Sequence, residues 1–352
     1  MEQIPKGAWV EPKPTDWVAG TESAITYEVR VENWFQYLPT REKQRNDKFD
    51  SNMCTTYSGL NCIETQLVYL MKHGLLPAEQ LAFLTNEGYL DENGHPNFNE
   101  VYSAKLNGTT INGNHLGAFW EGVREYGLIP QQDWLDISTA ETWDSLMETI
   151  PESRLAKGKR FKDMFAVNYE WVLLGAVRPD VLAMQSRHAP LHIAAPVCPT
   201  WNTGMVETCD MTRLQHATMI YGATEGHSLM DFDHYNPFEK MLAWDYYIPY
   251  AIKGIIKPKE VIPTIPKLVH TFTKNIKMGQ KSDEVLALQK ALRYLGHFKH
   301  AINTGYYGRI TADAVRSFQY KYQLASPDVL ADIDGTSVGP VTRAKLNELL
   351  AK

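Results

Sequence analysis

The stretch from Lys48 to Gly74, KFDSNMCTTYSGLNCIETQLVYLMKHG, constrains the fold most, because a polar turn becomes an apolar run at Cys54. The apolar residues that follow have helical spacing: Leu60, Ile63, Leu67, Leu70 and Met71. This pattern predicts an amphipathic helix that begins near Cys54 and ends at Gly74. A helix N-terminus favours an anion, so a thiol there is a candidate nucleophile. Position alone leaves Cys54 either as that nucleophile or as a buried thiol.

The pattern of the chain changes after two further helical segments, which we expect near residues 113–130 and 153–165. Short β-branched and aromatic segments follow, broken by Gly, Pro and Asn, at 189–197, 216–224, 227–235 and 241–256. Such segments are typical of an antiparallel sheet or barrel. Helices followed by strands predict an α+β fold for this part of the chain.

A proline-containing stretch at 257–276 has no clear periodicity and is predicted to be a linker. A length of 352 residues agrees with two domains, here 1–256 and 277–352. Beyond the linker, apolar stripes predict helices near 282–296, 310–324 and 339–350.

The segment 278–350 carries an ordered set of glycines, apolar residues and glutamines. Its positions are Gly279, Val285, Leu288, Gln289, Leu292, Leu295, Gly296, Gly305, Tyr307, Gly308, Thr311, Ala314, Val315, Phe318, Gln319, Asp334, Gly335, Gly339, Thr342 and Leu346. The set resembles the small, all-α, three-helix peptidoglycan-binding domain that is appended to many cell-wall hydrolases. The resemblance implies bacterial peptidoglycan as a partner. Most of the matched residues are core or turn residues, so they identify no ligand contacts.

Residues of about 30–250 resemble the papain-like cysteine peptidases, which pair a helical half with an antiparallel β half. The matched blocks are Gln44, Cys54, Tyr57–Ser58, Glu64 and Gln66, followed by 106–134, 189–197, 214–223 and 228–237. The resemblance implies that Cys54 is the nucleophile and His216 the general base and acid. It also implies that Gln44 supplies the oxyanion-hole amide. Asp233 stands where the family has its orienting asparagine, with Asn236 and Asp231 as alternatives.

These residue types suit acyl transfer. A thiolate attacks the carbonyl carbon, an imidazole moves the proton, and a third group orients the imidazole. Backbone and side-chain N–H groups stabilise the oxyanion. The sequence departs from the family before Cys54, because Gln44 lies farther upstream than the family pattern places its glutamine. Asp50 and Asn52 are alternative polar groups for that position.

Several classes of protein and site are disfavoured. A net charge of −6 disfavours a nucleic-acid-binding protein, which is usually basic. No apolar run is long enough to insert in a membrane. No His-x-Glu or Cys-x-x-Cys spacing marks a metal site, so we expect no catalytic metal and no cofactor. Four cysteines are too few for a disulfide scaffold; Cys198 and Cys209 are either a pair or two buried thiols.

The sequence as a whole predicts a cysteine endopeptidase that acts on peptidoglycan peptides and is targeted by its C-terminal domain. No secretory signal is seen at the N-terminus. We therefore expect synthesis in the cytoplasm and action at the bacterial cell wall, as for a phage endolysin or a virion-mounted lysin. Two alternatives remain: a catalytically degenerate scaffold that serves wall binding or virion structure, and a peptidase that processes proteins. Loops 93–103 and 137–158 are the expected walls of the cleft.

Overall fold

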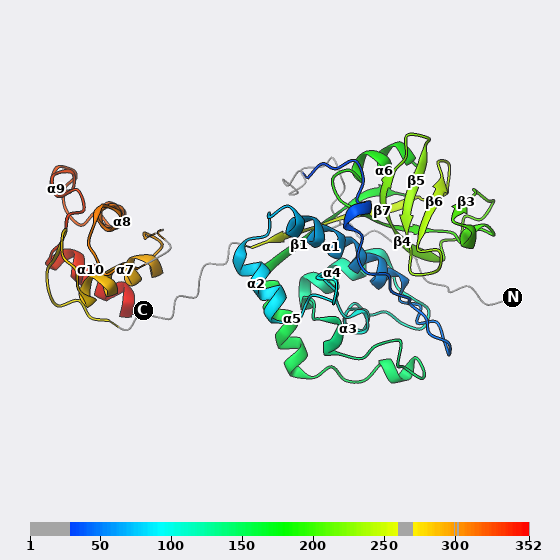
Figure 1. Ribbon diagram of the computed structural model, residues 1–352, viewed down its shortest axis with the longest axis horizontal. Helices are drawn as coiled ribbons and strands as arrows, with labels where there is room; N and C mark the ends of the chain where they lie inside the picture. Colours follow the sequence, from blue (N-terminus) through cyan, green and yellow to red (C-terminus); the bar gives the residue numbers. More distant parts are fainter. Residues whose placement is uncertain (1–28, 260–269, 299, 301–302, 352) are drawn as a thin grey trace. The chain divides into compact units, whose positions relative to one another are not determined.

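The computed structural model describes residues 29–259, 270–298, 300 and 303–351. The chain divides into two compact units between residues 260 and 261 (Figure 1). The first unit combines helices with a seven-stranded sheet, and the second is mainly helical. The predicted α+β class is therefore confirmed. No helix among the described residues is long and apolar enough to cross a membrane.

The helices of the first unit are α1 (Cys54–Lys72), α2 (Ala78–Asn86), α3 (Glu100–Leu106), α4 (Leu116–Tyr126), α5 (Glu152–Met164) and α6 (Pro179–Gln185). Short 3₁₀ turns lie at Phe35–Tyr37 (η1), Gln131–Asp133 (η2), Asp144–Leu146 (η3) and Trp201–Thr203 (η4). The predicted helices at 54–74, 113–130 and 153–165 correspond to α1, α4 and α5. The chain leaves α1 through Gly74, whose φ of 62° is easily reached only by glycine.

Helix α1 is the central helix of the first unit and lies against the sheet (Figure 1). It packs on β4 and β7 on one side and on α3 and α4 on the other. The approach to α4 is close, since a Cβ added at Gly59 would lie 2.3 Å from the ring of Phe119. This close packing fixes the start of α1, and therefore Cys54, relative to the sheet.

The sheet has the strand order β1-β7-β2-β4-β5-β6-β3. Its strands are β1 (Phe165–Leu174), β2 (Leu191–Ala195), β3 (Met205–Val206), β4 (His216–Ala223), β5 (Ser228–Phe232), β6 (Glu239–Ala243) and β7 (Tyr250–Pro258). Neighbouring strands are antiparallel except for β3 and β6. The predicted segments 189–197, 216–224 and 227–235 are confirmed as β2, β4 and β5. The single segment predicted at 241–256 is divided in the structure between β6 and β7, with residues 244–249 outside both strands. Strand β1 was not predicted, because its nearly continuous burial gives no alternating pattern.

Cys198 and Cys209 form a disulfide with a Cα–Cα distance of 5.9 Å. The two cysteines are therefore a pair and not two buried thiols. Their bond closes the loop that contains η4 and β3, after the end of β2. The loop carries Trp201, which is buried beside the candidate site.

The second unit contains α7 (Asp283–Tyr294), α8 (Arg309–Lys321), α9 (Pro327–Ile333) and α10 (Pro340–Ala351). The three predicted helices are α7, α8 and α10. The short α9 and a two-stranded ribbon of β8 (Ile276–Lys277) and β9 (Ser337–Val338) are additional. Buried apolar residues give this unit a core of its own, among them Leu288, Val315, Phe318 and Leu346.

The predicted linker at 257–276 is too long at both ends. Lys257 and Pro258 belong to β7 and pair with β1. Phe272 and Ile276 are buried in the core of the second unit. Both ends are ordered because they carry apolar or strand-pairing residues, which proline content alone does not reveal. Residues 260–269 lie outside the described part of the chain.

Candidate active site

Cys54 is the first residue of α1 and is fully buried. The turn before it requires a left-handed backbone at Asn52, with φ of 55°, a conformation that asparagine tolerates better than most residues. The Asn52 side chain secures the turn by donating to the carbonyl of Ile111 at 2.6 Å. The thiol therefore sits at the helix end, where the first N–H groups have no partner within the helix.

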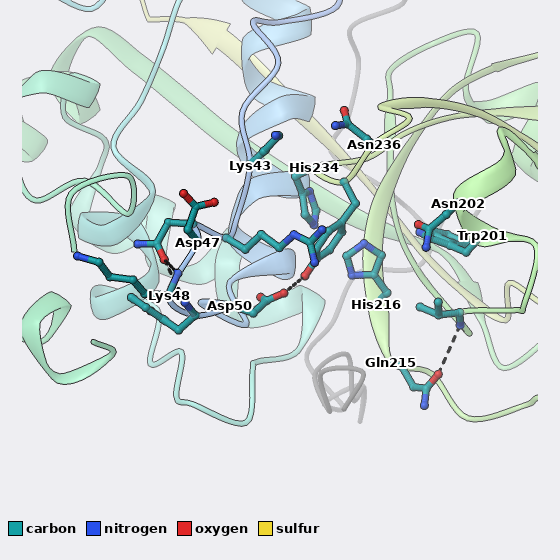
Figure 2. Close-up of a pocket in the computed structure, with 15 residues that line it drawn as sticks. Lys43, Asp47, Lys48, Asp50, Trp201, Asn202, Gln215, His216, His234 and Asn236 are labelled. Atoms are coloured by element: carbon teal, nitrogen blue, oxygen red, sulfur yellow. Dashed lines mark hydrogen bonds between the residues drawn. The ribbon is translucent and has the colours of Figure 1, made fainter. Parts of the chain in front are cut away.

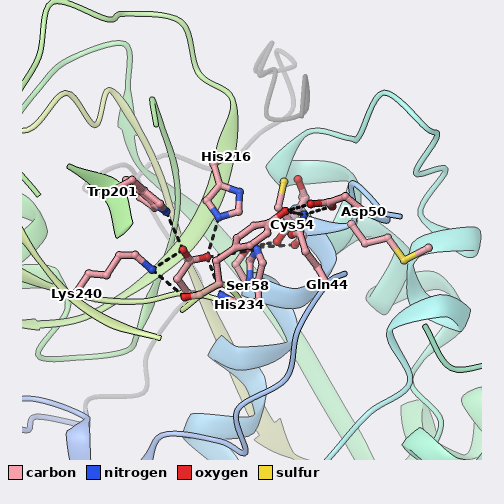
Figure 3. Close-up of polar contacts among 12 residues, drawn as sticks. Gln44, Asp50, Cys54, Ser58, Trp201, His216, His234 and Lys240 are labelled. Atoms are coloured by element: carbon pink, nitrogen blue, oxygen red, sulfur yellow. Dashed lines mark hydrogen bonds and ion pairs between the residues drawn. The ribbon is translucent and has the colours of Figure 1, made fainter. Parts of the chain in front are cut away.

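His216 begins β4 and contacts both Cys54 and Asp233 (Figure 3). Its Nε2 lies 2.7 Å from Asp233 Oδ1, which leaves Nδ1 for the thiol. Burial alone would lower the pKa of His216. The charge and hydrogen bond of Asp233 and the contact with Cys54 outweigh burial and raise that pKa to about 10. The imidazole is therefore held as an imidazolium at neutral pH.

Asp233 follows β5 and is fully buried, yet it remains charged. Burial would raise its pKa, but the positive charges of His216 and Lys240 hold that pKa far below its usual range. Its Oδ1 also accepts from the backbone N–H of His234 at 2.7 Å. Its Oδ2 accepts from Trp201 Nε1 at 2.9 Å and from Lys240 Nζ at 2.8 Å. Both carboxylate oxygens are thus satisfied.

Trp201 and Lys240 were not predicted as site residues. The Trp201 ring meets the His216 ring edge-on, with centroids 5.7 Å apart. One signal in the sequence could have found Lys240: a buried aspartate in place of an asparagine needs a countercharge. Lys240 is a cation seven residues after Asp233.

Gln44 is buried and belongs to the same cluster of polar contacts (Figure 3). Its Nε2 donates to Asp50 Oδ1 at 2.7 Å and to the Tyr235 hydroxyl at 2.5 Å. Tyr235 in turn donates to Asp50 Oδ2. The three side chains form a closed ring that uses both hydrogens of the Gln44 amide. Asp50 therefore contacts Gln44 and does not replace it.

The two alternative orienting residues lie elsewhere. Asn236 is exposed at the wall of a cavity and precedes a cis peptide bond to Pro237. Asp231 is buried in β5, where burial and the charge of Asp233 raise its pKa to about 7. It is Asp233 whose carboxylate contacts the His216 ring.

A cavity of about 490 Å³ opens beside His216 (Figure 2). One stretch of chain ahead of α1 and three short stretches from the β half line it. The lining residues are Lys43, Arg45, Asn46, Asp47, Lys48, Phe49, Asp50, Val197, Trp201, Asn202, Gln215, His216, His234, Tyr235 and Asn236. Loops 93–103 and 137–158 contribute none of these residues, so the expectation that they wall the cleft was wrong for this cavity. Residues 100–106 form α3 and 152–158 belong to α5.

His216, Asp233 and His234 bring ligand atoms within 4.8 Å of one another, a spacing that a metal ion can use. The Lys240 ammonium, however, already neutralises Asp233, and both carboxylate oxygens accept hydrogen bonds. We therefore assign no metal to these residues. The absence of a catalytic metal stays a prediction.

Cys62, the other free cysteine among the described residues, differs from Cys54 in its surroundings. It lies within α1, away from the helix end, and is fully buried. Burial and the nearby Glu64 raise the pKa of its thiol. Cys62 is therefore an unreactive packing residue and a natural internal control for Cys54.

Residues 281–332 match the family model described as a putative peptidoglycan binding domain. The match covers part of the second unit. No curated protein matches the sequence with significance.

Among solved structures, the chain is similar to digestive procathepsin L 3 of the Tenebrio molitor larval midgut, with 12% identity and a TM-score of 0.44 over 71% of this chain and 76% of that one. It is similar to the bromelain protease of Ananas comosus in complex with the E64 inhibitor, with 9% identity and a TM-score of 0.39 over 64% and 97%. It is also similar to the proform of the ragweed pollen cysteine protease Amb a 11, with 11% identity and a TM-score of 0.42 over 72% of this chain and 64% of that one. Identities and scores this low say nothing about individual residues, so the roles of Cys54 and His216 depend on the geometry above.

Proposed function

We propose that this protein is a thiol peptidase that hydrolyses peptide bonds in bacterial peptidoglycan, in its stem peptides or cross-bridges. The observation that carries the proposal is the contact of His216 with Cys54 on one side and with Asp233 on the other. In this arrangement the thiol at the helix start is the nucleophile. The imidazole is the general base, and the buried carboxylate orients the imidazole.

The reaction follows from these contacts. His216 takes the proton of the Cys54 thiol before the substrate binds, which makes its ring the imidazolium described above. The thiolate then attacks the peptide carbonyl carbon to form a C–S bond and an oxyanion. When the oxyanion collapses, the C–N bond breaks and His216 gives its proton to the leaving amine. Water, deprotonated by His216, then cleaves the thioester and releases the acid. Asp233 keeps the imidazole oriented throughout.

The oxyanion needs hydrogen-bond donors that are fixed in advance. The backbone N–H of Cys54 is one candidate, because it stands at the free end of α1. The amide of Gln44 is the other. Since Asp50 and Tyr235 use both hydrogens of this amide, Gln44 would exchange one of these bonds for the oxyanion during the reaction.

The match of residues 281–332 to a putative peptidoglycan binding domain supports the choice of substrate. A unit that binds the wall raises the local concentration of the attached peptidase on an insoluble polymer. We further propose that the protein is a phage lysin, free or carried on the virion; a hydrolytic unit joined to a wall-binding unit supports this role. Expression inside a bacterial host together with a membrane pore former should then lyse the culture.

The direct test is digestion of purified peptidoglycan by the full chain, with mass analysis of the released fragments. We expect new amino and carboxyl ends at one type of peptide bond, and none from Cys54→Ala. The matched control, Cys62→Ala, should release the same fragments. Binding to the wall without any cleavage would favour the degenerate scaffold. Cleavage of proteins but not of peptidoglycan would favour the protein-processing peptidase.

A further inference from the structure

Lys240 on β6 is a charged side chain with no exposure to solvent. Its ammonium lies 2.8 Å from Asp233 Oδ2 and 3.0 Å from the carbonyl of Tyr235, and it also donates to the carbonyl of Pro237. Three acceptors match the three hydrogens of an ammonium. The ammonium also lies 5.5 Å from the centre of the Trp201 ring. A buried cation is strongly destabilising unless it is paired and hydrogen-bonded, and the Lys240 ammonium is both.

The charged groups around Asp233 show what this ammonium does. His216 contacts one carboxylate oxygen and Lys240 the other, so a single carboxylate is shared between two cations. Asp231, the register partner of Lys240 across β5 and β6, adds a second buried carboxyl. His234 lies 3.6 Å from Asp233, and burial lowers its pKa to about 3, so that it stays neutral. His216 also contacts Cys54. The nearby Tyr235 hydroxyl donates a hydrogen bond to Asp50.

We propose that Lys240 is a positioning residue for the reaction, whose ammonium neutralises Asp233 so that this carboxylate orients His216 without binding its proton too tightly. The inference rests on the proposed function, because it gives Lys240 a role in the thiol–imidazole chemistry. It assigns to the site a fourth charged group beyond Cys54, His216 and Asp233.

The physical reason lies in the proton that His216 must release. As a general acid, the imidazolium gives its proton to the leaving amine, so its pKa must not be too far above the working pH. A buried carboxylate without a countercharge stabilises an adjacent imidazolium strongly, because the interaction is little screened. Lys240 reduces this stabilisation, since Asp233 and Lys240 together carry no net charge.

The two charges of the pair can be removed one at a time or together, and each variant has a distinct expectation. Lys240→Met leaves Asp233 without its ammonium and should raise the pKa of His216. Asp233→Asn leaves a buried cation facing the imidazole and should lower it. The double variant removes both charges and also the hydrogen bond from the ring to Asp233, so the pKa of His216 should lie above that of Asp233→Asn and below that of the wild type.

The measurement is the titration of the His216 ring in the full chain by NMR with labelled histidine, assigned with His216→Gln. We expect shifts of about one pH unit or more, upward for Lys240→Met and downward for Asp233→Asn, with the double variant between Asp233→Asn and the wild type. The high-pH limb of kcat/KM on peptidoglycan fragments should move in the same directions. Lys240→Arg keeps the charge, so it should change the pKa of His216 by less than half as much as Lys240→Met does.

A purely structural role for Lys240 predicts a lower melting temperature with no change in the His216 titration, and that result would overturn the proposal. So would shifts of the same sign in both single variants. Lys253→Met is the matched control. Lys253 lies on β7 of the same sheet and forms a partly buried ion pair with Glu170, at 2.7 Å. Strands β2, β4 and β5 separate β7 from β6, which carries Lys240. Lys253→Met should leave the His216 titration unchanged.

Two features keep this test decisive. If Lys240→Met does not fold, the comparison of Asp233→Asn with the double variant still measures the effect of the ammonium. The titration also needs no substrate. Opposite pKa shifts in the two single variants without any peptidoglycan hydrolysis would therefore contradict the proposed function and support the electrostatic role of Lys240. Hydrolysis with an unchanged His216 titration would support the proposed function and contradict the role of Lys240.

Discussion

Asp233 illustrates at the scale of one residue how a buried charge is kept. Four donors surround it within 2.9 Å: the ring of His216, the backbone of His234, the indole of Trp201 and the ammonium of Lys240. Removing one partner of such a set leaves an uncompensated charge, which is why single substitutions here are expected to cost more than the double one.

Asp231, two residues before Asp233, is predicted to destabilise the protein at alkaline pH. Burial and the charge of Asp233 raise its pKa from 3.8 to about 7. Between these values the folded chain binds a proton that the unfolded chain has lost, so stability rises as the pH falls through this window. Above it, the ionised buried carboxylate opposes folding.

Asp231→Asn cannot ionise, so its free energy of unfolding should exceed that of the wild type by about 2 to 4 kcal/mol near pH 8. The gain should vanish near pH 4. Urea unfolding at both pH values measures the difference. Asp163→Asn, at an exposed position in α5, should show no such gain. A gain independent of pH would mean that Asp231 acts by packing and not by charge.

Substitutions of Gln44 and Tyr235 test whether the Gln44 amide is the side-chain donor to the oxyanion. Gln44→Ala should lower kcat about 100-fold with little change in KM, because it removes a donor needed only in the transition state. Tyr235→Phe removes a competing contact of that amide and should leave kcat within a few-fold of the wild type. An equal loss in Tyr235→Phe would instead assign the donor to the tyrosine hydroxyl. Single-turnover hydrolysis of a peptidoglycan fragment distinguishes these outcomes.

At the scale of the element, the loop closed by Cys198 and Cys209 positions Trp201 so that its indole N–H donates to Asp233. Replacing both cysteines by serine should lower the free energy of unfolding by about 2 to 4 kcal/mol, as for other loops of this size. It should also lower kcat, because the indole is no longer held against the carboxylate. Trp201→Phe, which keeps the packing but loses the N–H, should lower kcat with a smaller change in the melting temperature. An unchanged kcat in both variants would show that the loop serves stability alone.

The elements that could be predicted from the sequence are those with a clean period or a strong end signal. Helix α1 has both, with apolar residues at helical spacing and Gly74 at its end. Strands β2 and β4 are short apolar runs between turn residues. Strand β1 was missed because both of its faces are buried, and α9 because seven residues are too few to show a period.

The site residues divide in the same way. Cys54, His216 and Asp233 were predicted from the resemblance of their sequence blocks to those of papain-like cysteine peptidases, and the structure brings all three together. The need of Asp233 for a countercharge indicates a cation, but the choice of Lys240 depends on the β5–β6 register. Trp201 could not be predicted, since its contact depends on a disulfide-closed loop. The use of both Gln44 hydrogens by Asp50 and Tyr235 is likewise a property of the folded chain.

At the scale of the whole molecule, each unit has a separate hydrophobic core. A chain ending at residue 260 should therefore fold and keep its kcat on a soluble peptide fragment. On intact walls its rate should fall by about tenfold or more at low enzyme concentration, because the wall-binding unit no longer raises the local concentration. Equal loss on both substrates would show that the second unit supports the fold or the site of the first. Rates on matched soluble and insoluble substrates decide this.

The central claim is that His216 activates Cys54, and the alkylation rate of Cys54 by iodoacetamide near pH 6 tests it most directly. Because the pKa of His216 is raised to about 10, the imidazolium is present at that pH to hold a thiolate beside it. We predict that Cys54 in the full chain is alkylated at least about tenfold faster than in His216→Ala, and far faster than Cys62 in the same molecule. Equal rates for Cys54 in the two proteins, or a Cys54 no more reactive than Cys62, would contradict the account.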